Sequence, residues 1–292
     1  MNMRYTVVGG DDRQAYLANL LTRDGHQVIC SGMENSTIVS REIKAKPLPE
    51  AVLAADIVVL PLPATRDGVT INANNSYTRL YLAEVFDNLQ DGVIAVGGML
   101  DRKLTEAAEA RGIVIYDYLK REEMSILNAI PTAEGALEIA IRETDFTLHS
   151  SKCLVSGYGR IGKILSKMLM DLGADVTVSA RKCADLAWIK QAGCRAVHIS
   201  GIFAEEKEYD IIFNTVPDVI FDRHALSKIT NKESVLIIDL ASDPGGIDIE
   251  AAGTMGIKSI RALSLPGKVA PKTAAAIIRD TIYNIVQEDK NG

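Results

Sequence analysis

The sequence predicts an α/β protein of two domains, each with a parallel sheet that helices cover. The length of 292 residues corresponds to two domains of average size. The chain is 47% hydrophobic but only 5% aromatic, and its many Val, Ile, Leu and Ala residues are typical of buried parallel strands. Short apolar runs alternate with helix-compatible segments in both halves, which is the pattern of βαβ units.

The first half of the chain holds one series of these elements. Strands are expected at 5–8, 27–30, 56–60, 92–96 and 112–116, with helices at 13–22 and 101–111. A helix-compatible stretch then runs from 118 to 143. Because proline lacks an amide hydrogen, Pro131 is expected to end one helix and to begin the next, over 132–142. We interpret this stretch as a helical connector between the domains.

The second half repeats the alternation. Strands are expected at 152–156, 175–179, 195–198, 210–214, 234–239 and 256–260, with helices at 160–172, 184–192, 222–229, 247–255 and 272–288. The predicted domains are residues 1–128 and 129–271. The C-terminal helix, within 272–292, is expected to pack back on the first domain.

Charge and cysteine content exclude several classes of protein. The net charge of −6 argues against a nucleic acid or an anionic membrane as the main partner, and no apolar run is long enough for a membrane span. The four cysteines show no Cys-x-x-Cys spacing, so neither a zinc site nor a disulfide framework is expected. We expect no bound metal and a cytoplasmic location.

The strongest motif is a glycine-rich turn between the apolar strand at 152–156 and the helix at 160–172. Its residues are Gly157, Tyr158, Gly159, Arg160, Ile161 and Gly162. The first glycine permits a tight turn, the second lets a pyrophosphate approach the backbone, and the third lets the helix pack on the strand. The N-terminus of the helix then offers N–H groups to the phosphates. The second domain is therefore predicted to bind a dinucleotide.

The end of the next strand indicates which dinucleotide. NAD-specific sites carry a carboxylate there for the ribose 2′-hydroxyl, but this strand ends in Ser179, Arg181 and Lys182. A hydroxyl and a guanidinium suit a 2′-phosphate, so we expect Ser179 and Arg181 to bind NADP. The alternative is that Arg181 and Lys182 are a solvated pair in a loop.

Later loops at the carboxyl ends of strands are further candidates, because open α/β sheets bind ligands at that edge. The expected cofactor-binding residues in these loops are Asn214, Thr215, Val216, Pro217, Leu240, Ala241, Ser242 and Pro266. Lys268 and Lys272 flank the start of the last helix and form a candidate anion site. The alternatives are ordinary βα turns and two solvated lysines.

Taken in order, these motifs resemble the family of dipicolinate synthase A subunits. The resemblance rests on G-Y-G-R-I-G, N-T-V-P, D-L-A-S-D-P-G-G and L-P-G-K-V-A-P-K-T-A, together with the N-terminal V-V-G-G-D-D-R-Q-A-Y and the connector N-A-I-P-T-A-E-G-A. It covers essentially the whole chain. It implies two Rossmann-like domains with an active-site cleft between them, the first for substrate and the second for NADP.

The resemblance also implies an activity. The family oxidises a dihydrodipicolinate-type intermediate of the lysine pathway to pyridine-2,6-dicarboxylate with NADP. It does so in the mother cell of sporulating bacteria, beside a flavoprotein-like B subunit. By this likeness we expect an oxidoreductase in the cytoplasm that forms a homo-oligomer.

A dicarboxylate substrate calls for cationic side chains. We expect Arg13, in the loop after the first strand, and Lys268 or Lys272 to bind its carboxylates, with Arg13 and Lys272 also in catalytic roles. The same loop contributes Asp11 to substrate binding. Because its Gly-Gly turn lacks a complete dinucleotide pattern, we interpret the loop as substrate-facing or degenerate. The alternative is a plain helix start capped by Asp12.

Three further residues are assigned to the substrate site. Thr65 follows another strand of the first domain, and Thr132 begins the second helix of the connector. Glu134, in the first turn of that helix, either serves as the catalytic base or completes the turn. No histidine lies in a motif loop, so none is assigned to catalysis.

Two other functions stay open on the sequence alone. One is a different two-domain dehydrogenase for an amino or hydroxy acid, although the usual His–Glu pair of hydroxyacid dehydrogenases is not apparent. The other is a non-catalytic subunit that binds NADP in support of a partner enzyme. A substrate panel separates the first from dipicolinate synthesis, and variants of Arg13 and Lys272 test the second.

Overall fold

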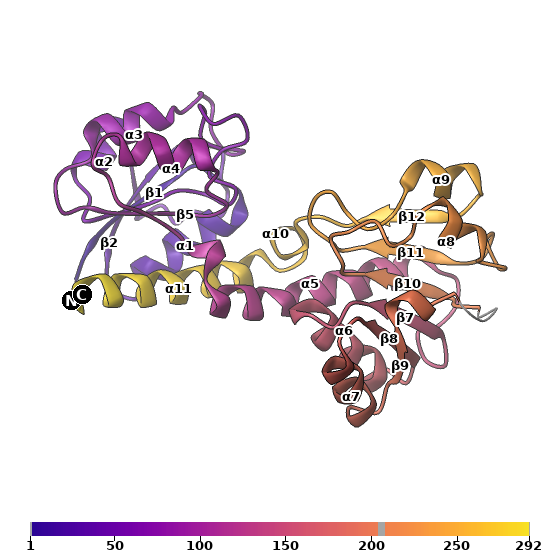
Figure 1. Cartoon of the computed structure of the whole chain (residues 1–292). Helices are drawn as coiled ribbons and strands as arrows, with labels where there is room; N and C mark the ends of the chain where they lie inside the picture. The colour runs from indigo at the N-terminus through magenta and orange to yellow at the C-terminus, as the bar shows by residue number, and fades with distance from the viewer. Residues whose placement is uncertain (1, 204–207, 292) are drawn as a thin grey trace. The chain divides into compact units, whose positions relative to one another are not determined.

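The computed structural model describes residues 2–203 and 208–291 (Figure 1). Met1, residues 204–207 and Gly292 fall within the predicted domain ranges but lie outside the described residues. The chain divides into two compact units: unit 1 is Met1–Asn128 with Ala270–Gly292, and unit 2 is Ala129–Val269. Each unit carries one sheet of six strands, and every pair of neighbouring strands is parallel. The predicted α/β class is confirmed.

The sheet of unit 1 has the strand order β3-β2-β1-β4-β5-β6. Its strands are β1 Arg4–Val8, β2 Gln27–Ser31, β3 Lys44–Ala45, β4 Ile57–Val59, β5 Ile94–Gly97 and β6 Ile115–Asp117. Its helices are α1 Asp12–Arg23, α2 Leu48–Leu53, α3 Leu82–Asn88, α4 Arg102–Glu109, the 3₁₀ turn η1 Tyr118–Lys120 and the C-terminal α11 Pro271–Asn291.

Helices cover both faces of this sheet, because successive side chains of a buried strand point to opposite faces. Tyr5 and Val7 of β1 pack in one core cluster with α1 and α11, whereas Val8 packs in another with α2, α3 and α4. Figure 1 shows α11, in yellow, beside α1, in indigo. Ile278 and Ile282 of α11 are fully buried in the first cluster, so the end of the chain completes the core of unit 1.

Three elements of unit 1, namely β3, α2 and α3, were not predicted from the sequence. These elements are two, six and seven residues long, too short for a periodic pattern to register. Pro49 lies in the first turn of α2, where a proline costs no hydrogen bond. Glu84 accepts a hydrogen bond from the N–H of Tyr81 and so helps to fix the start of α3.

The sheet of unit 2 has the strand order β12-β11-β10-β7-β8-β9. Its strands are β7 Lys152–Ser156, β8 Asp175–Ala180, β9 Arg195–His198, β10 Ile211–Asn214, β11 Leu236–Asp239 and β12 Lys258–Arg261. Its helices are α6 Arg160–Asp171, α7 Cys183–Gln191, the 3₁₀ turn η2 Ile199–Gly201, α8 Arg223–Ser227, α9 Ile249–Thr254 and α10 Leu265–Val269. On one face, α6, α7 and α10 pack on the sheet, and α8 and α9 cover the other.

The connector is one helix, α5 Glu122–Glu143, with Pro131 in its interior. The predicted break at Pro131, and the predicted helix start at Thr132, are therefore wrong. A proline inside a helix removes one backbone hydrogen bond, but packing supports the helix on both sides of it. Met124 is buried in the core of unit 1, and Ala136 is buried in the core of unit 2.

A second correction concerns the segment before α11, which was expected to be a loop. It contains α10, and this short helix packs on α5 at Gly135. A Cβ atom at Gly135 would lie 3.0 Å from Cβ of Leu265 and 3.2 Å from a methyl group of Val269. Gly135 thus serves a close approach of two helices rather than a helix start.

Candidate functional site

The glycine turn after β7 has the shape that a dinucleotide requires. Gly157 adopts a φ of +97°, and a Cβ there would lie 2.5 Å from Oγ1 of Thr215. A Cβ at Gly162 would lie 2.1 Å from the carbonyl oxygen of Gly157, so only glycine lets α6 pack this closely on the turn. At Gly159, by contrast, nothing lies within 4 Å of a built Cβ. The turn is tight on its inner side and open at the position where a pyrophosphate approaches.

The helix that follows presents its N-terminus at this opening. Gly159 is the N-cap of α6 and supplies no capping side chain, which suits an anion as the partner of the first-turn N–H groups. Arg160 is exposed, and Ile161 is half-buried against the core. Tyr158 is half-buried, with Nζ of Lys163 5.4 Å from its ring centre. The residues present therefore fit a dinucleotide.

The strand order places a second loop beside this turn. β7 lies between β8 and β10, so the order reverses at β7 and β10, where open α/β sheets bind their ligands. The loop after β10 begins with Thr215, whose hydroxyl donates to the carbonyl oxygen of Ser156 over 2.8 Å. Val216 is half-buried and Pro217 is exposed. The structure thus brings the predicted loop at 214–217 against the glycine turn.

Asn214 has a different place from the one expected. Its side chain is fully buried. Its amide nitrogen donates to Oδ1 of Asp239 over 2.8 Å and to the carbonyl oxygen of Val216 over 3.0 Å. Its amide oxygen accepts from the N–H of Val216. Because these bonds engage both ends of the amide, Asn214 supports the loop rather than offering its side chain to a ligand.

Ser179 is also corrected by its position. It lies inside β8 with no exposed surface, and its hydroxyl is 3.0 Å from that of Ser156 on the neighbouring strand. Ser179 was assigned to the cofactor because this strand was expected to end there, but β8 continues to Ala180. Arg181 and Lys182 follow this strand and are both exposed. They are the cations at the carboxyl end of β8.

The remaining residues assigned to the cofactor lie after β11 and β12. Leu240 and Ala241 are buried, and Ser242 is exposed. Pro266 is buried within α10 and not in a loop. Sequence reasoning missed Asp239, the last residue of β11, although a carboxylate at the end of an otherwise apolar strand was a signal that it could have used.

In unit 1, Arg13 lies within α1 and not in the loop before it. It is 6% exposed, and its guanidinium makes three hydrogen bonds to the carboxylate of Asp11, the shortest at 2.8 Å, and one to the carbonyl oxygen of Leu62. Asp11 also accepts from the N–H of Arg13 and caps the helix, so the predicted cap at Asp12 is wrong. The two side chains form an ion pair at the carboxyl end of β1, in which the Arg13 guanidinium is buried and held in place.

The glycine pair before Asp11 is closed by the chain itself. Gly9 and Gly10 have φ angles of +55° and +88°. The N–H of Gly10 donates to the carbonyl oxygen of Asn72, and the N–H of Asn74 donates to that of Gly10. A Cβ at Gly9 would lie 2.9 Å from the carbonyl oxygen of Asn72, so the backbone at 72–74 packs directly against this turn. This arrangement agrees with a turn that lacks the complete dinucleotide pattern.

The other residues assigned to the substrate are spread over the chain. Thr65 is buried, accepts from the N–H of Gly68 and contacts Asp67. Thr132 is half-buried and Glu134 is exposed, both in the middle of α5, where no helix N-terminus is present. Lys268, on α10, belongs to unit 2, whereas Lys272, in the first turn of α11, belongs to unit 1. Both lysines are exposed.

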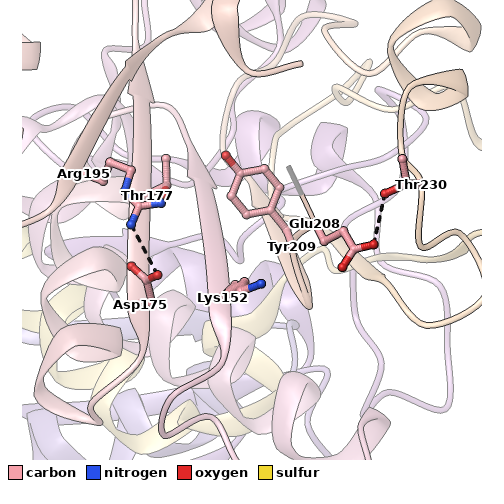
Figure 2. A pocket seen from close by; sticks show the side chains of 7 residues that line it. All are labelled: Lys152, Asp175, Thr177, Arg195, Glu208, Tyr209 and Thr230. Carbon is pink, nitrogen blue, oxygen red and sulfur yellow. Dashed lines mark hydrogen bonds and ion pairs between the residues drawn. The ribbon is translucent and has the colours of Figure 1, made fainter. Parts of the chain in front are cut away.

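A pocket of about 640 Å³ lies elsewhere in unit 2 (Figure 2). Lys152, Asp175 and Arg195, which line it, are the first residues of β7, β8 and β9. The pocket is therefore at the amino ends of the strands, the opposite edge from the glycine turn. Three of its charged groups have partners: Arg195 pairs with Asp175 over 3.5 Å, and Glu208 accepts a hydrogen bond from Thr230 over 3.4 Å.

Two searches of the described residues bear on other classes of site. No group of three or more His, Cys, Asp or Glu side chains within 2–203 and 208–291 is arranged to hold a metal ion. In the same part of the chain, no helix combines the length and the apolar character that crossing a membrane requires. Cys30, Cys153 and Cys194 are buried free thiols, and Cys183 is exposed.

Comparison with solved structures confirms the fold class. The crystal structure of the dipicolinate synthase A subunit from Bacillus halodurans has a TM-score of 0.89 at 28% identity and covers 97% of each chain. A transhydrogenase from Sinorhizobium meliloti has a TM-score of 0.70 at 16% identity, over 97% of this chain and 93% of its own. That second likeness shows a common fold alone, the dehydrogenase type with two Rossmann-like domains.

Sequence comparison identifies the family. The model for the N-terminal domain of the dipicolinate synthase A subunit matches residues 4–119. The dipicolinate synthase A subunit of Bacillus subtilis (strain 168) is 32% identical over 292 residues, which cover 98% of this chain and 96% of that protein. On this full-length likeness, the chain belongs to the family of dipicolinate synthase A subunits.

Proposed function

We propose that this chain is an NADP-dependent oxidoreductase that converts a dihydrodipicolinate-type intermediate to dipicolinate. The observation that carries the proposal is the glycine turn of unit 2. It has no room for a side chain at Gly157 and Gly162 and is open at Gly159, in a chain of the dipicolinate synthase family. In this proposal unit 2 binds the dinucleotide and unit 1 contributes to substrate binding.

The reaction balances with one nicotinamide and no metal. When bound, the oxidised nicotinamide supplies a hydride acceptor for one ring carbon of the dihydropyridine. A proton leaves the ring, and the products are pyridine-2,6-dicarboxylate and NADPH. Because formation of an aromatic ring drives the step, the protein has mainly to hold the two rings in contact and to neutralise the carboxylates.

NADP is proposed over NAD because of the end of β8. Arg181 and Lys182 are exposed after that strand, and neither has an acidic partner in residues 2–203 and 208–291. A carboxylate would repel a 2′-phosphate, whereas a guanidinium can bind it through two parallel hydrogen bonds. Arg181 is therefore the proposed 2′-phosphate ligand.

Arg13 is the proposed partner of one substrate carboxylate. Asp11 and the carbonyl oxygen of Leu62 hold its guanidinium in place, so little side-chain entropy is lost when an anion binds. Lys268 or Lys272 is proposed for the second carboxylate, with Thr65 and Thr132 as polar neighbours. Glu134 is still proposed as the proton acceptor, but only because it carries a carboxylate. It does not lie at a helix start, as was expected.

Family membership supports the proposed setting. The family is named for one of the subunits of a synthase, which implies a second, partner subunit. We propose that this partner is a flavoprotein-like B subunit. We further propose a homo-oligomer that works in the cytoplasm of the mother cell during sporulation.

The test is a coupled assay with purified chain. An upstream synthase generates the dihydrodipicolinate-type substrate, and NADPH formation and the ultraviolet absorbance of dipicolinate are followed together, with and without the B subunit. Equal amounts of both products are expected. If neither product forms in either mixture, the proposed reaction is wrong. NADPH formed from other amino or hydroxy acids, in a substrate panel, would instead identify a different dehydrogenase.

A further inference from the structure

Asp239 is a buried carboxylate that joins two loops at the carboxyl edge of the unit 2 sheet. It is the last residue of β11 and is 1% exposed. Oδ1 accepts from the amide of Asn214 over 2.8 Å and from the N–H of Ala241 over 3.2 Å. Oδ2 accepts from the N–H of Gly246 over 3.0 Å. One side chain thus fixes the loop after β10 and both ends of the loop after β11.

The contact with Asn214 links Asp239 to the glycine turn. Asn214 closes a small turn on Val216 and so sets the backbone of Thr215. Oγ1 of Thr215 lies where a Cβ of Gly157 would be, 2.5 Å from it, and donates to the carbonyl oxygen of Ser156. The side chains therefore form a continuous path from Asp239 to the turn that is open at Gly159.

Close packing around Asp239 shows that the path has little freedom to rearrange. A Cβ at Gly246 would lie 2.1 Å from the amide nitrogen of Asn214, and a Cβ at Gly245 would lie 2.7 Å from Oδ2 of Asp239. The loop also holds an outer contact, in which Arg261 donates to Asp243 and to the carbonyl oxygen of Pro244. The two glycines are thus needed for the loop to reach the carboxylate.

We propose that Asp239 is a positioning residue for the dinucleotide, acting through Asn214 on the loop at 214–217. The inference rests on the proposed function only in that unit 2 must bind NADP. It does not depend on which substrate is oxidised. Asp239 touches neither the cofactor nor the substrate in this proposal, so it is not a catalytic residue.

The experiment compares Asp239→Asn with the exchanged pair Asn214→Asp/Asp239→Asn. The single substitution turns one carboxylate oxygen into an NH₂ group, which faces either the amide nitrogen of Asn214 or the N–H of Gly246, so one of the two loops loses its bond. The exchange restores one donor and one acceptor between the same two positions. Asp175→Asn, at the amino end of β8, is the matched control of the same chemistry. NADPH binding is measured by energy transfer from Trp188, the only tryptophan of the chain, and folding by thermal melting.

Asp239→Asn is expected to raise the Kd for NADPH about tenfold or more, as for the loss of a buried hydrogen bond. The exchanged pair is expected to recover part of that loss, because an aspartate at 214 regains the bond to position 239 but cannot donate to the carbonyl oxygen of Val216. Asp175→Asn is expected to bind as the wild type does. In turnover, the KM for NADP is expected to rise more than kcat falls, a split that general destabilisation does not produce.

Equal NADPH affinity of Asp239→Asn and the wild type would overturn the inference and leave the proposed function intact. So would an exchanged pair that melts like the wild type yet binds as weakly as the single variant. If Asp239→Asn does not fold, the exchanged pair decides alone. A wild-type chain that binds neither NADPH nor NADH would overturn the proposed function, and this inference with it.

Discussion

The two units begin in the same way and differ at the turn that follows their first strand. In unit 1, β1 leads into Gly9 and Gly10 and then α1. In unit 2, β7 leads into Gly157 and Gly159 and then α6. In the first turn the N–H of Gly10 bonds to the carbonyl oxygen of Asn72, whereas in the second turn nothing lies within 4 Å of a Cβ at Gly159.

In the proposed function only unit 2 binds the dinucleotide, so a strand, a glycine turn and a helix would not suffice for such a site. The polar groups of the turn must also be left without a partner from the same chain. Unit 1 satisfies the N–H of Gly10 internally, and the cap of α1 is supplied by Asp11. Unit 2 caps α6 with a glycine that offers no side chain. The two units thus differ in whether a side chain caps the helix that follows the turn.

The largest effects are expected within the turn of unit 2. Gly162→Ala places a methyl group about where the carbonyl oxygen of Gly157 already lies, and should lower the free energy of unfolding by about 3 kcal/mol or more. Gly159→Ala meets nothing within 4 Å and should change it by less than about 1 kcal/mol. The same methyl group should weaken NADPH binding about tenfold or more, because it fills the space of the pyrophosphate.

Thermal melting and energy transfer from Trp188 measure the two effects separately. The matched variant in unit 1 is Gly10→Ala, where φ is +88° and a Cβ would lie 2.7 Å from the side chain of Gln14. It should cost stability without changing the affinity for NADPH. A loss of affinity in Gly10→Ala, or its absence in Gly159→Ala, would contradict the assignment of the dinucleotide to unit 2.

The next effect concerns the choice between the two dinucleotides. Arg181→Ala should raise the Kd for NADPH about tenfold to a hundredfold, as for the loss of a charge-assisted hydrogen-bonded pair, and leave the Kd for NADH nearly unchanged. Arg195→Ala, in the same sheet but at its amino edge, is the control. Titration of each variant with both nucleotides checks this, and equal losses for the two would refute a 2′-phosphate role.

The smallest effect is a pH dependence confined to unit 1. His26 lies between the rings of Tyr5 and Tyr283, and its Nδ1 accepts from the N–H of Met3. Burial lowers the pKa of His26 in the folded chain. The unfolded chain therefore binds more protons below about pH 6.5, and the free energy of unfolding should fall as the pH drops through that value.

Melting of the wild type and of His26→Gln between about pH 7 and pH 5 measures this dependence. The stability of His26→Gln should change less with pH than that of the wild type, because glutamine does not titrate. His198→Gln, on an exposed histidine of unit 2, should keep the full pH dependence. An identical slope in the wild type and His26→Gln would show that the histidine does not link pH to the stability of unit 1.

The sequence predicted the fold best where apolar strands alternate with long helices. β7 and β9 begin and end at the predicted residues. The elements missed in unit 1 are short, and α10 was hidden by a proline and a glycine in its own sequence. Pro131 was misread because a local rule disfavours a proline inside a helix, whereas packing of the flanking turns in two cores supports it.

The backbone geometry of the candidate site was predictable from the sequence, but the directions of its side chains were not. The glycine pattern carries the geometry of the turn in the local sequence. The directions of Ser179 and Asn214 depend instead on Ser156 and Asp239, residues more than twenty positions away in the chain. The same holds for Arg13, whose contact with Leu62 is set by the loop after β4, far away in the chain. Long-range partners decide whether a polar residue faces a ligand or supports a loop.

The position of α11 has a consequence for how the chain is made. Its isoleucines complete the core of unit 1, yet they leave the ribosome only after the whole of unit 2 has been made. Unit 2 is one uninterrupted stretch, Ala129–Val269, and all of it is synthesised before the core of unit 1 can close. In a nascent chain the inner unit can fold while the outer one still waits for its final helix. A stop codon before α11 would therefore damage the beginning of the protein more than its middle.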